Sequence, residues 1–209
     1  MILLTGFERF SDLDCNPSEL IVQCIAEPAH ERGETDLVTE VLPTEYGRAE
    51  NRIRMLIREF KPQAIVGLGV AAGAQGIRLE RVALNLDDSD EPDNSGEIAR
   101  GRLIQAKGLT AYWSTLPLPR MLDALRKLGI PAFISNHAGT FVCNHIFYVA
   151  RHEVARLHIR ARCGFIHVPL RLEDVKRAPG SEFSLPLAVM VEGIECCLNV
   201  LHDRDTPVR

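Results

Sequence analysis

An uninterrupted run of apolar residues at Ala64–Val70, which reads Ala-Ile-Val-Gly-Leu-Gly-Val, limits the folds that this chain can adopt. A strand without polar side chains on either face is expected to be buried on both faces, as central strands are in parallel sheets covered by helices. Further short apolar runs predict strands at 2–5, 37–42, 108–116, 132–134 and 164–168.

Segments with helical spacing of apolar residues lie between these strands. They predict helices at 45–60, 119–128, 143–158 and about 185–202. Another helix is expected to start at Asn16, because asparagine is a favoured N-cap and Pro17 suits the first helical position. The alternation of strands and helices predicts an α/β fold, in which helices cover both faces of a twisted, largely parallel sheet. We expect residues 1–209 to form a single domain.

Composition excludes several functional classes. The net charge of −4 argues against the basic surface that nucleic-acid binding requires, and no apolar run reaches the length of a membrane span. We therefore expect neither a nucleic-acid nor a membrane partner. The six cysteines are scattered without a Cys-x-x-Cys pair, which favours reduced thiols and a cytoplasmic location.

Cys143 is the best candidate for a reactive side chain. It follows a turn of small residues, Ala138–Thr140, and precedes apolar residues that recur at helical spacing. We therefore place it at a helix N-terminus, where unpaired N–H groups and the helix dipole favour a thiolate. A buried structural cysteine is the alternative, and for a cysteine taken alone it is the more common case.

A nucleophilic thiol needs a base, and the base needs a group that orients it. The best candidate base is His167, near the end of an apolar strand that precedes Pro169. The best candidate for the orienting group is Glu80, in the predicted strand Ile77–Leu86. Taken alone, such a histidine is more often part of the core, and such a glutamate is more often solvated.

Six segments of the chain, in the same order, resemble the pyroglutamyl peptidase I family, also called pyrrolidone-carboxylate peptidases. They are Leu4–Phe10, Asn16–Ser18, Glu80–Asn85, Pro92–Gly96, Ala138–His145 and Gly164–Pro169. The resemblance covers nearly the whole chain, and the segment around Cys143 is the most specific. It implies a cysteine exopeptidase (an omega peptidase) that acts without a cofactor on peptides with N-terminal pyroglutamate, often as a homotetramer.

The resemblance also implies roles for individual residues. Cys143 would attack the carbonyl that follows the lactam ring, His167 would transfer the proton, and Glu80 would hold the histidine in the right tautomer. Because the pyroglutamyl ring is uncharged, its pocket needs apolar walls. By resemblance these are Phe7, Phe10, Phe141 and Val142.

Two positions depart from the family pattern. The family usually has Gln where this chain has Val70, and Arg where it has Asp90. An acid near a forming oxyanion would repel it. Arg78 is the nearest candidate to take the place of the family's arginine. The alternative is therefore a catalytically weak or silent relative that binds small amides or peptides. We expect Asp90→Arg to raise kcat if the loop carries Asp90 to the reacting carbonyl.

Metal binding is considered for the histidines and for an acidic segment. His145 and His152 are seven residues apart, which is too far for two ligands on one helix face. The segment Asp87–Asp93 has Pro92 where the EF-hand pattern needs a ligand, so we interpret it as a solvated acidic loop. We therefore expect no metal site.

Overall fold

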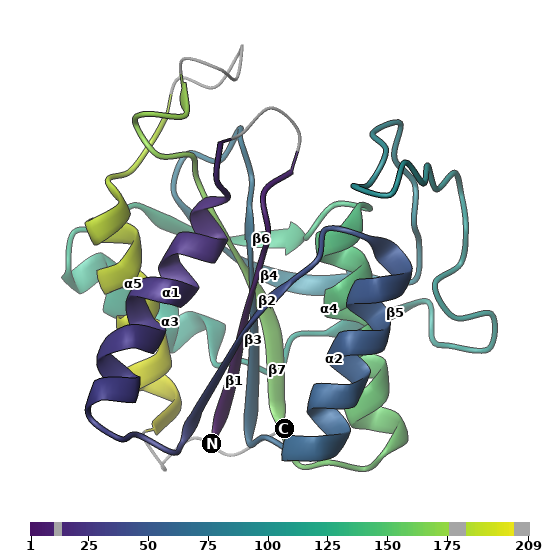
Figure 1. Ribbon diagram of the computed structural model, residues 1–209, viewed down its shortest axis with the longest axis horizontal. Helices are drawn as coiled ribbons and strands as arrows, with labels where there is room; N and C mark the ends of the chain where they lie inside the picture. The colour runs from purple at the N-terminus through teal and green to yellow at the C-terminus, as the bar shows by residue number, and fades with distance from the viewer. Residues whose placement is uncertain (11–13, 176–182, 203–209) are drawn as a thin grey trace.

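The computed structural model describes residues 1–10, 14–175 and 183–202 (Figure 1). Strands and helices alternate as predicted except between residues 64 and 113, where three strands follow one another without a helix. The strands are β1 (Ile2–Phe7), β2 (Leu37–Leu42), β3 (Ala64–Val70), β4 (Ile77–Leu84), β5 (Ala111–Trp113), β6 (Ala132–His137) and β7 (Arg162–Val168). The helices are α1 (Pro17–Glu31), α2 (Tyr46–Phe60), α3 (Leu118–Lys127), α4 (Val142–Arg156) and α5 (Leu187–His202).

The strands of the described residues form one mixed sheet in the order β2-β1-β3-β7-β4-β5, and β6 pairs with β4. Strands β2, β1, β3 and β7 are parallel, whereas β4 runs antiparallel to β7 and to β5. The predicted α/β fold with a largely parallel sheet is confirmed, and β3 occupies the central position expected for its apolar run. Because β3 and β7 are parallel neighbours, their carboxyl ends lie at the same edge of the sheet.

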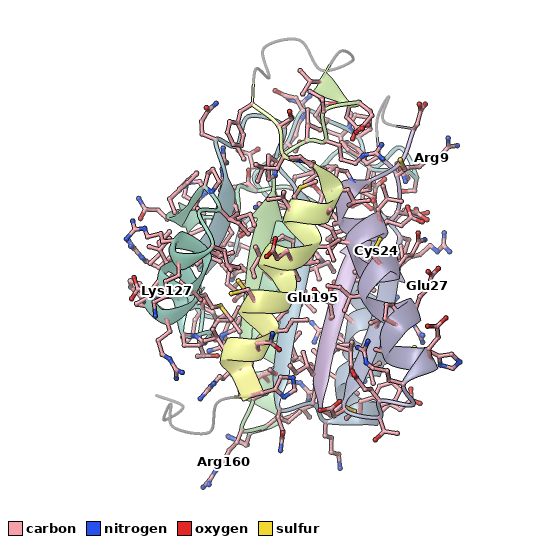
Figure 2. The ribbon with its side chains drawn as sticks, turned by 90° about the vertical axis from the view of Figure 1, so that its left-hand side faces the viewer. Arg9, Cys24, Glu27, Lys127, Arg160 and Glu195 are labelled. Carbon is pink, nitrogen blue, oxygen red and sulfur yellow. The ribbon has the colours of Figure 1, made fainter. Side chains whose placement is uncertain are left out.

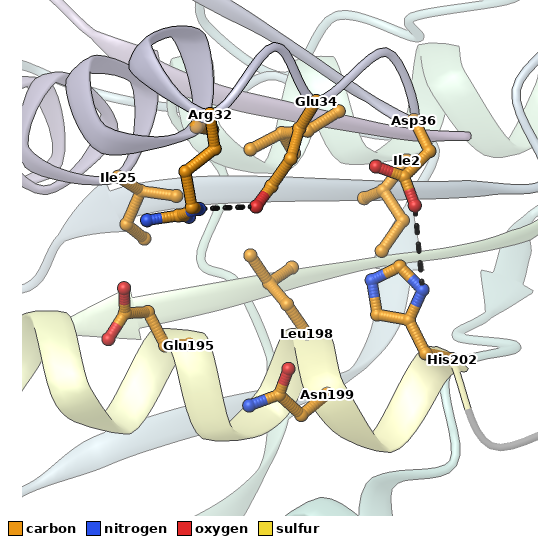
Figure 3. Close-up of a pocket in the computed structure, with 11 residues that line it drawn as sticks. Ile2, Ile25, Arg32, Glu34, Asp36, Glu195, Leu198, Asn199 and His202 are labelled. Carbon is orange, nitrogen blue, oxygen red and sulfur yellow. Dashed lines mark hydrogen bonds and ion pairs between the residues drawn. The ribbon is translucent and has the colours of Figure 1, made fainter.

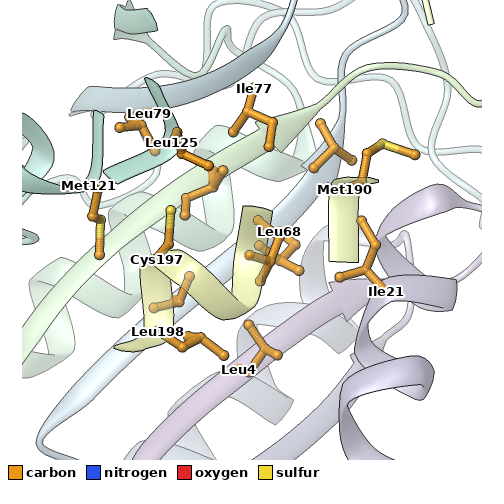
Figure 4. Packing of buried hydrophobic residues seen from close by; sticks show 14 of the residues in the cluster. Leu4, Ile21, Leu68, Ile77, Leu79, Met121, Leu125, Met190, Cys197 and Leu198 are labelled. Atoms are coloured by element: carbon orange, nitrogen blue, oxygen red, sulfur yellow. The ribbon is translucent and has the colours of Figure 1, made fainter. Parts of the chain in front are cut away.

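Helices cover both faces of the sheet, and a hydrophobic core fills each side (Figure 1). Helices α1, α3 and α5 lie on one face, where Leu68, Ile166 and Ile194 are among the buried side chains. Figure 4 shows this packing, with Leu68 of the sheet near Met190 and Leu198 of α5. Charged side chains such as Glu27, Lys127 and Glu195 lie on the outer side of the same three helices (Figure 2).

The second core lies between the sheet and helices α2 and α4. It contains the rings of Phe147 and Phe165 together with Ile65, Ile53 and Val149. At its edge, Glu153 of α4 is fully buried and pairs with arginines of both helices, Arg54, Arg58 and Arg156. These ion pairs fix α2 against α4, the helix whose first turn contains Cys143.

The start of α1 is tied directly to the end of β1. The Asn16 side chain caps the helix by accepting a hydrogen bond from the Ser18 amide at 3.0 Å, as predicted for an asparagine N-cap. Ser18 in turn accepts a hydrogen bond from the Phe7 amide at 3.0 Å. Phe7 and Ser18 are both buried, so this hydrogen bond holds the end of β1 against the start of α1.

Two predictions about the chain between β4 and α3 are wrong. The strand predicted at 108–116 is limited to β5, because the carbonyl of Leu109 accepts a hydrogen bond from the Tyr148 hydroxyl instead of joining a strand ladder. The acidic segment is not simply solvated, because Asp87 and Asp93 are buried. Asp87 pairs with Arg102 and His145, and Asp93 accepts hydrogen bonds from backbone amides.

Candidate active site

Cys143 lies in the first turn of α4, as predicted. The preceding turn contains Gly139 with φ of 79°, a conformation that favours glycine, and Phe141 is extended before the helix begins. Cys143 is partly exposed. Its sulfur lies against the backbone of β3 at Gly69, so the reactive group of the helix faces the central strand.

His167 lies on β7, directly beside Gly69 of β3 and Arg78 of β4 in the strand register. Its imidazole is buried, and its Nδ1 lies 2.8 Å from Oε1 of Glu80. A carboxylate only accepts hydrogen bonds, so Nδ1 carries the proton and Nε2 is left to interact with the thiol. Cys143 is close enough to the imidazole to raise its pKa, and its sulfur lies over Gly69, the register neighbour of His167. The structure therefore brings the three predicted residues together.

Glu80 is completely buried, which corrects the simpler interpretation of a solvated strand residue. It lies at a position of β4 that pairs with both β6 and β7. Its Oε2 has no hydrogen-bond partner among the described residues, so His167 provides its one polar contact there. A buried carboxylate whose contact is a single imidazole stabilises the charged form of that imidazole.

The electrostatics of the site favour a protonated histidine. Burial of the ring lowers the pKa of His167, but the hydrogen bonds and charges of Cys143 and Glu80 outweigh it. The net effect raises the pKa from 6.5 to about 9. At neutral pH an imidazolium therefore stands beside the thiol, which is the arrangement that activates cysteine as a nucleophile.

The predicted apolar residues are divided between the site and the core. The ring centroids of Phe10 and Phe141 lie 5.0 Å apart, and both residues are partly exposed. Phe141 is two residues before Cys143 in the chain, and Phe10 packs against it. Val142 is buried directly after Phe141. Phe7, by contrast, is the last residue of β1 and packs against Phe165 in the core, beneath the surface that a substrate could reach.

Asp90 does not lie at a reacting centre in the described structure. Its side chain is 87% exposed and pairs with Arg100, which is itself exposed. The loop therefore carries Asp90 outward to solvent, and the expectation that Asp90→Arg raises kcat loses its structural basis. Val70 ends β3 opposite Val168. Arg78 remains beside His167 on β4, with its guanidinium 5.8 Å from the Phe133 ring.

Known proteins that are similar to this chain agree with this site. The sequence model of the pyroglutamyl peptidase family matches residues 1–204. Pyrrolidone-carboxylate peptidases are 39% identical in Bacillus licheniformis, over 98% of this chain and 94% of the relative, and 37% identical in Bacillus cereus, over 95% and 91%.

The chain belongs to the pyroglutamyl peptidase family. Solved structures agree with this assignment. The crystal structure of pyroglutamyl peptidase I from Bacillus amyloliquefaciens is similar with a TM-score of 0.88 and 37% identity, covering 95% of this chain and 93% of that one. A variant of pyrrolidone carboxyl peptidase from Pyrococcus furiosus has a TM-score of 0.87 and 30% identity, covering 98% and 99%.

Within this family fold, Asn144 is a site residue whose contacts sequence reasoning missed. Its buried amide donates to the carbonyls of Leu84 and Leu86 and accepts from the Leu84 amide, all at 2.9–3.0 Å. These bonds fasten the start of α4 to the end of β4, the strand that carries Glu80. The one available signal was its position directly after Cys143 in the most specific segment.

Tyr46 was also missed. It is the first residue of α2, and its ring meets Phe141 edge-on at 5.7 Å and His145 at 5.3 Å. The Phe10–Phe141 pair therefore rests on a third aromatic ring. No sequence signal distinguished Tyr46 from any other residue at a helix start.

The second histidine of α4 has a different environment from His167. His145 lies between two carboxylates, with Nδ1 2.9 Å from Asp87 and Nε2 3.2 Å from Glu50. Burial lowers its pKa, but the two carboxylates outweigh burial and raise it. His145 thus joins α4 to α2 and to the segment after β4, whereas the other histidine considered as a ligand, His152, contacts Tyr112.

A separate cavity of about 320 Å³ lies at the opposite end of the sheet (Figure 3). It is lined by Ile2 at the start of β1, by apolar side chains of α1, and by charged side chains of α5 and the loop before β2. Figure 3 shows Arg32 paired with Glu34, and Asp36 paired with His202. Because Cys143 and His167 lie at the carboxyl ends of the strands, this cavity is distinct from the candidate active site.

No helix in the described ranges combines the length and the apolar composition that crossing a lipid bilayer requires.

Proposed function

We propose that this protein hydrolyses the amide bond that joins an N-terminal pyroglutamyl residue to the rest of a peptide. Membership of the pyroglutamyl peptidase family supports the reaction. The observation that carries the proposal is the placement of the Cys143 sulfur over Gly69, the register neighbour of His167, whose Nδ1 lies 2.8 Å from Glu80. This is the set of groups that thiol-based acyl transfer requires.

In the first half of the reaction, the sulfur of Cys143, whose proton is already on His167, forms a bond to the pyroglutamyl carbonyl carbon, and the carbonyl oxygen takes up the negative charge. The tetrahedral intermediate then collapses, the carbon–nitrogen bond breaks, and His167 protonates the leaving amine. Unpaired N–H groups in the first turn of α4 are suited to stabilise the oxyanion. The product on the protein is a thioester.

In the second half, water attacks the thioester carbonyl and gives its proton to His167. The carbon–sulfur bond breaks, free pyroglutamate leaves, and the sulfur of Cys143 again lies beside the protonated His167. Glu80 keeps the imidazole in one tautomer through both halves. Every proton is passed through His167, so the cycle needs no cofactor.

The walls of the site explain the preference for a lactam. The pyroglutamyl ring carries no charge, and the partly exposed rings of Phe10 and Phe141, with Val142 beside them, offer it apolar contact. An ordinary peptide presents a charged amine, whose desolvation without a partner costs several kcal/mol. The site therefore selects against unblocked N-termini.

A fluorogenic pyroglutamyl amide tests the proposal. We expect the wild type to release the fluorophore and Cys143→Ala to release none. Cys163→Ala is the matched control, because Cys163 is buried on β7 away from the reacting groups. A prolyl amide of the same fluorophore, which carries a charged amine, should be a poor substrate. Equal release by Cys143→Ala and wild type would refute the proposal.

We further propose that the protein assembles with copies of itself. Support comes from apolar side chains exposed on and before the edge strand β5, namely Ile98, Leu103, Leu109 and Trp113, which are 46–66% exposed. They belong to a segment that extends beyond α2 and α4 in Figure 1. Light scattering should give a mass above that of the 23.3 kDa chain, and Trp113→Ser with Leu103→Ser should reduce it.

A reducing compartment suits this chemistry. All six cysteines lie in the described residues and none forms a disulfide there. A thiol nucleophile is lost on oxidation, so we propose that the protein works in the cytoplasm. Cell fractionation should recover the peptidase activity with cytoplasmic markers, and recovery outside them would contradict this.

A further inference from the structure

Strand β3 lacks side chains at the place where α4 approaches it. Residues two apart on a strand share a face, so Ile65, Gly67 and Gly69 all face α2 and α4. Ile65 contributes its side chain to the core on that side. The next two positions, toward the carboxyl end of β3, are bare backbone.

Two other groups occupy the space that side chains at Gly67 and Gly69 would take. A Cβ atom at Gly67 would lie 2.5 Å from the Phe165 ring, and one at Gly69 would lie 3.1 Å from the same ring. Phe165 packs against His167 at 4.9 Å and against Phe147 of α4 at 6.1 Å. The ring thus lies across the bare part of β3 and supports the catalytic histidine.

The contact at Gly69 differs from that at Gly67 in one respect. A Cβ at Gly69 would lie 2.7 Å from the sulfur of Cys143, far inside the 3.5–4.0 Å at which non-bonded carbons meet, whereas only the ring approaches Gly67. The thiol has a single side-chain torsion and cannot yield as a long chain does. A methyl group at position 69 must therefore displace the sulfur or the start of α4.

We propose that Gly69 is a positioning residue, whose missing side chain provides the space in which the Cys143 thiol meets His167. Gly69 and His167 are register neighbours on β3 and β7, so sulfur placed over Gly69 is beside the imidazole. As a statement about catalysis this rests on the function proposed above. As a statement about the thiol it depends on the contacts alone.

The first test is the alkylation of Cys143 by iodoacetamide at neutral pH, followed by peptide mapping. Gly69→Ala should slow labelling of Cys143 by roughly tenfold or more, because the displaced sulfur loses its place beside the imidazolium. Gly67→Ala is the matched control. It crowds the same ring without touching the thiol, so it should keep the wild-type rate of labelling at Cys143.

The second test is a double-mutant cycle in thermal stability, which needs no activity. Gly69→Ala should lower Tm in the wild type and lower it less in Cys143→Ala, because alanine has no sulfur to displace. Gly67→Ala should lower Tm equally in both backgrounds. If Gly69→Ala alone fails to fold, the double variant with Cys143→Ala is expected to fold.

Several results would overturn the proposal. Unchanged alkylation in Gly69→Ala, additive changes in Tm, or failure of the double variant to fold would show that Gly69 serves only the packing of Phe165. Failure of the proposed function is distinguishable from these results. It would appear as a wild type that is inactive on pyroglutamyl amides, and the alkylation rates would still report on Gly69.

Discussion

Glu80→Gln is the substitution whose effect the structure defines most sharply. Glutamine keeps the size of the side chain but removes the charge that lies 2.8 Å from Nδ1 of His167. The imidazolium then loses one of its two stabilising partners and keeps the other, Cys143. We therefore expect the pKa of His167 to fall while the fold persists.

The magnitude follows from the pKa of His167, which the folded protein raises from 6.5 to about 9. At 1.36 kcal/mol per pH unit, the imidazolium is favoured by roughly 3 kcal/mol. Cys143 contributes more to this than Glu80. A hydrogen bond to a charged group is worth about 1.5–3 kcal/mol. We take the lower end of this range for Glu80, because Glu80 contributes less than Cys143. Glu80→Gln should therefore lower the pKa of His167 by about one pH unit.

The raised pKa also sets the sign of the pH dependence. A group that binds its proton more tightly when folded stabilises the fold fully below its unfolded pKa. That stabilisation is lost as pH rises from about 6.5 through about 9. The free energy of unfolding should therefore decrease over this range, and Glu80→Gln should show a smaller decrease.

The assay is kcat/KM on a pyroglutamyl amide as a function of pH. The wild type should lose activity on the alkaline side near pH 9, and Glu80→Gln should lose it about one unit lower, with a reduced maximum. Glu50→Gln is the control, because it removes a carboxylate from a different histidine, His145, and should leave the alkaline limb in place. A limb that stays near pH 9 in Glu80→Gln would refute the assignment of Glu80.

Three further predictions concern the surroundings of the site. Phe10→Ala should lower kcat/KM, with a loss of transition-state stabilisation of about 1–3 kcal/mol, because the substrate loses apolar contact. Unchanged kinetics with an intact circular dichroism spectrum would show that Phe10 only packs against Phe141. Asp90→Arg should leave kcat unchanged at low and high salt, because solvent screens the exposed pair with Arg100, and a salt-dependent increase would contradict this. Burial raises the pKa of Glu153, but hydrogen bonds from arginines outweigh burial and lower the pKa to about 2. The contribution of Glu153 to the stability of the fold is therefore present above about pH 4.5 and is lost as the pH falls toward 2. Glu153→Gln should cost about 3–5 kcal/mol in urea unfolding at pH 7; a smaller loss there than at pH 3 would contradict the buried pairing.

Local patterns were enough to predict the elements that build the site. The apolar run of β3 required a central strand, and the small-residue turn before Cys143 required a helix start. Both depend on neighbours in the sequence. The roles of His167 and Glu80 depended instead on the resemblance to a family, because the two residues are 87 positions apart and each alone has a more common interpretation.

The errors arose where a distant partner decides the environment. Asp87 looks solvated in a run of acids, but His145, 58 residues away, pairs with it in the core. The sequence before β5 predicts a strand, but in the fold the carbonyl of Leu109 accepts a hydrogen bond from the distant Tyr148 hydroxyl. Gly69 is one glycine in an apolar run, and its contact with Cys143 becomes visible only when α4 is placed on the sheet.

Trapping the acyl-enzyme shows which residue of the protein is the nucleophile. The wild type is mixed with a pyroglutamyl amide and quenched in acid within one turnover, and the protein is analysed by intact mass and peptide mapping. We predict a mass gain of one pyroglutamyl group, located on Cys143 and absent from Cys143→Ala. Turnover of the substrate with the group on another residue, or with no adduct when hydrolysis of the thioester is slowed, would contradict a thiol nucleophile at Cys143.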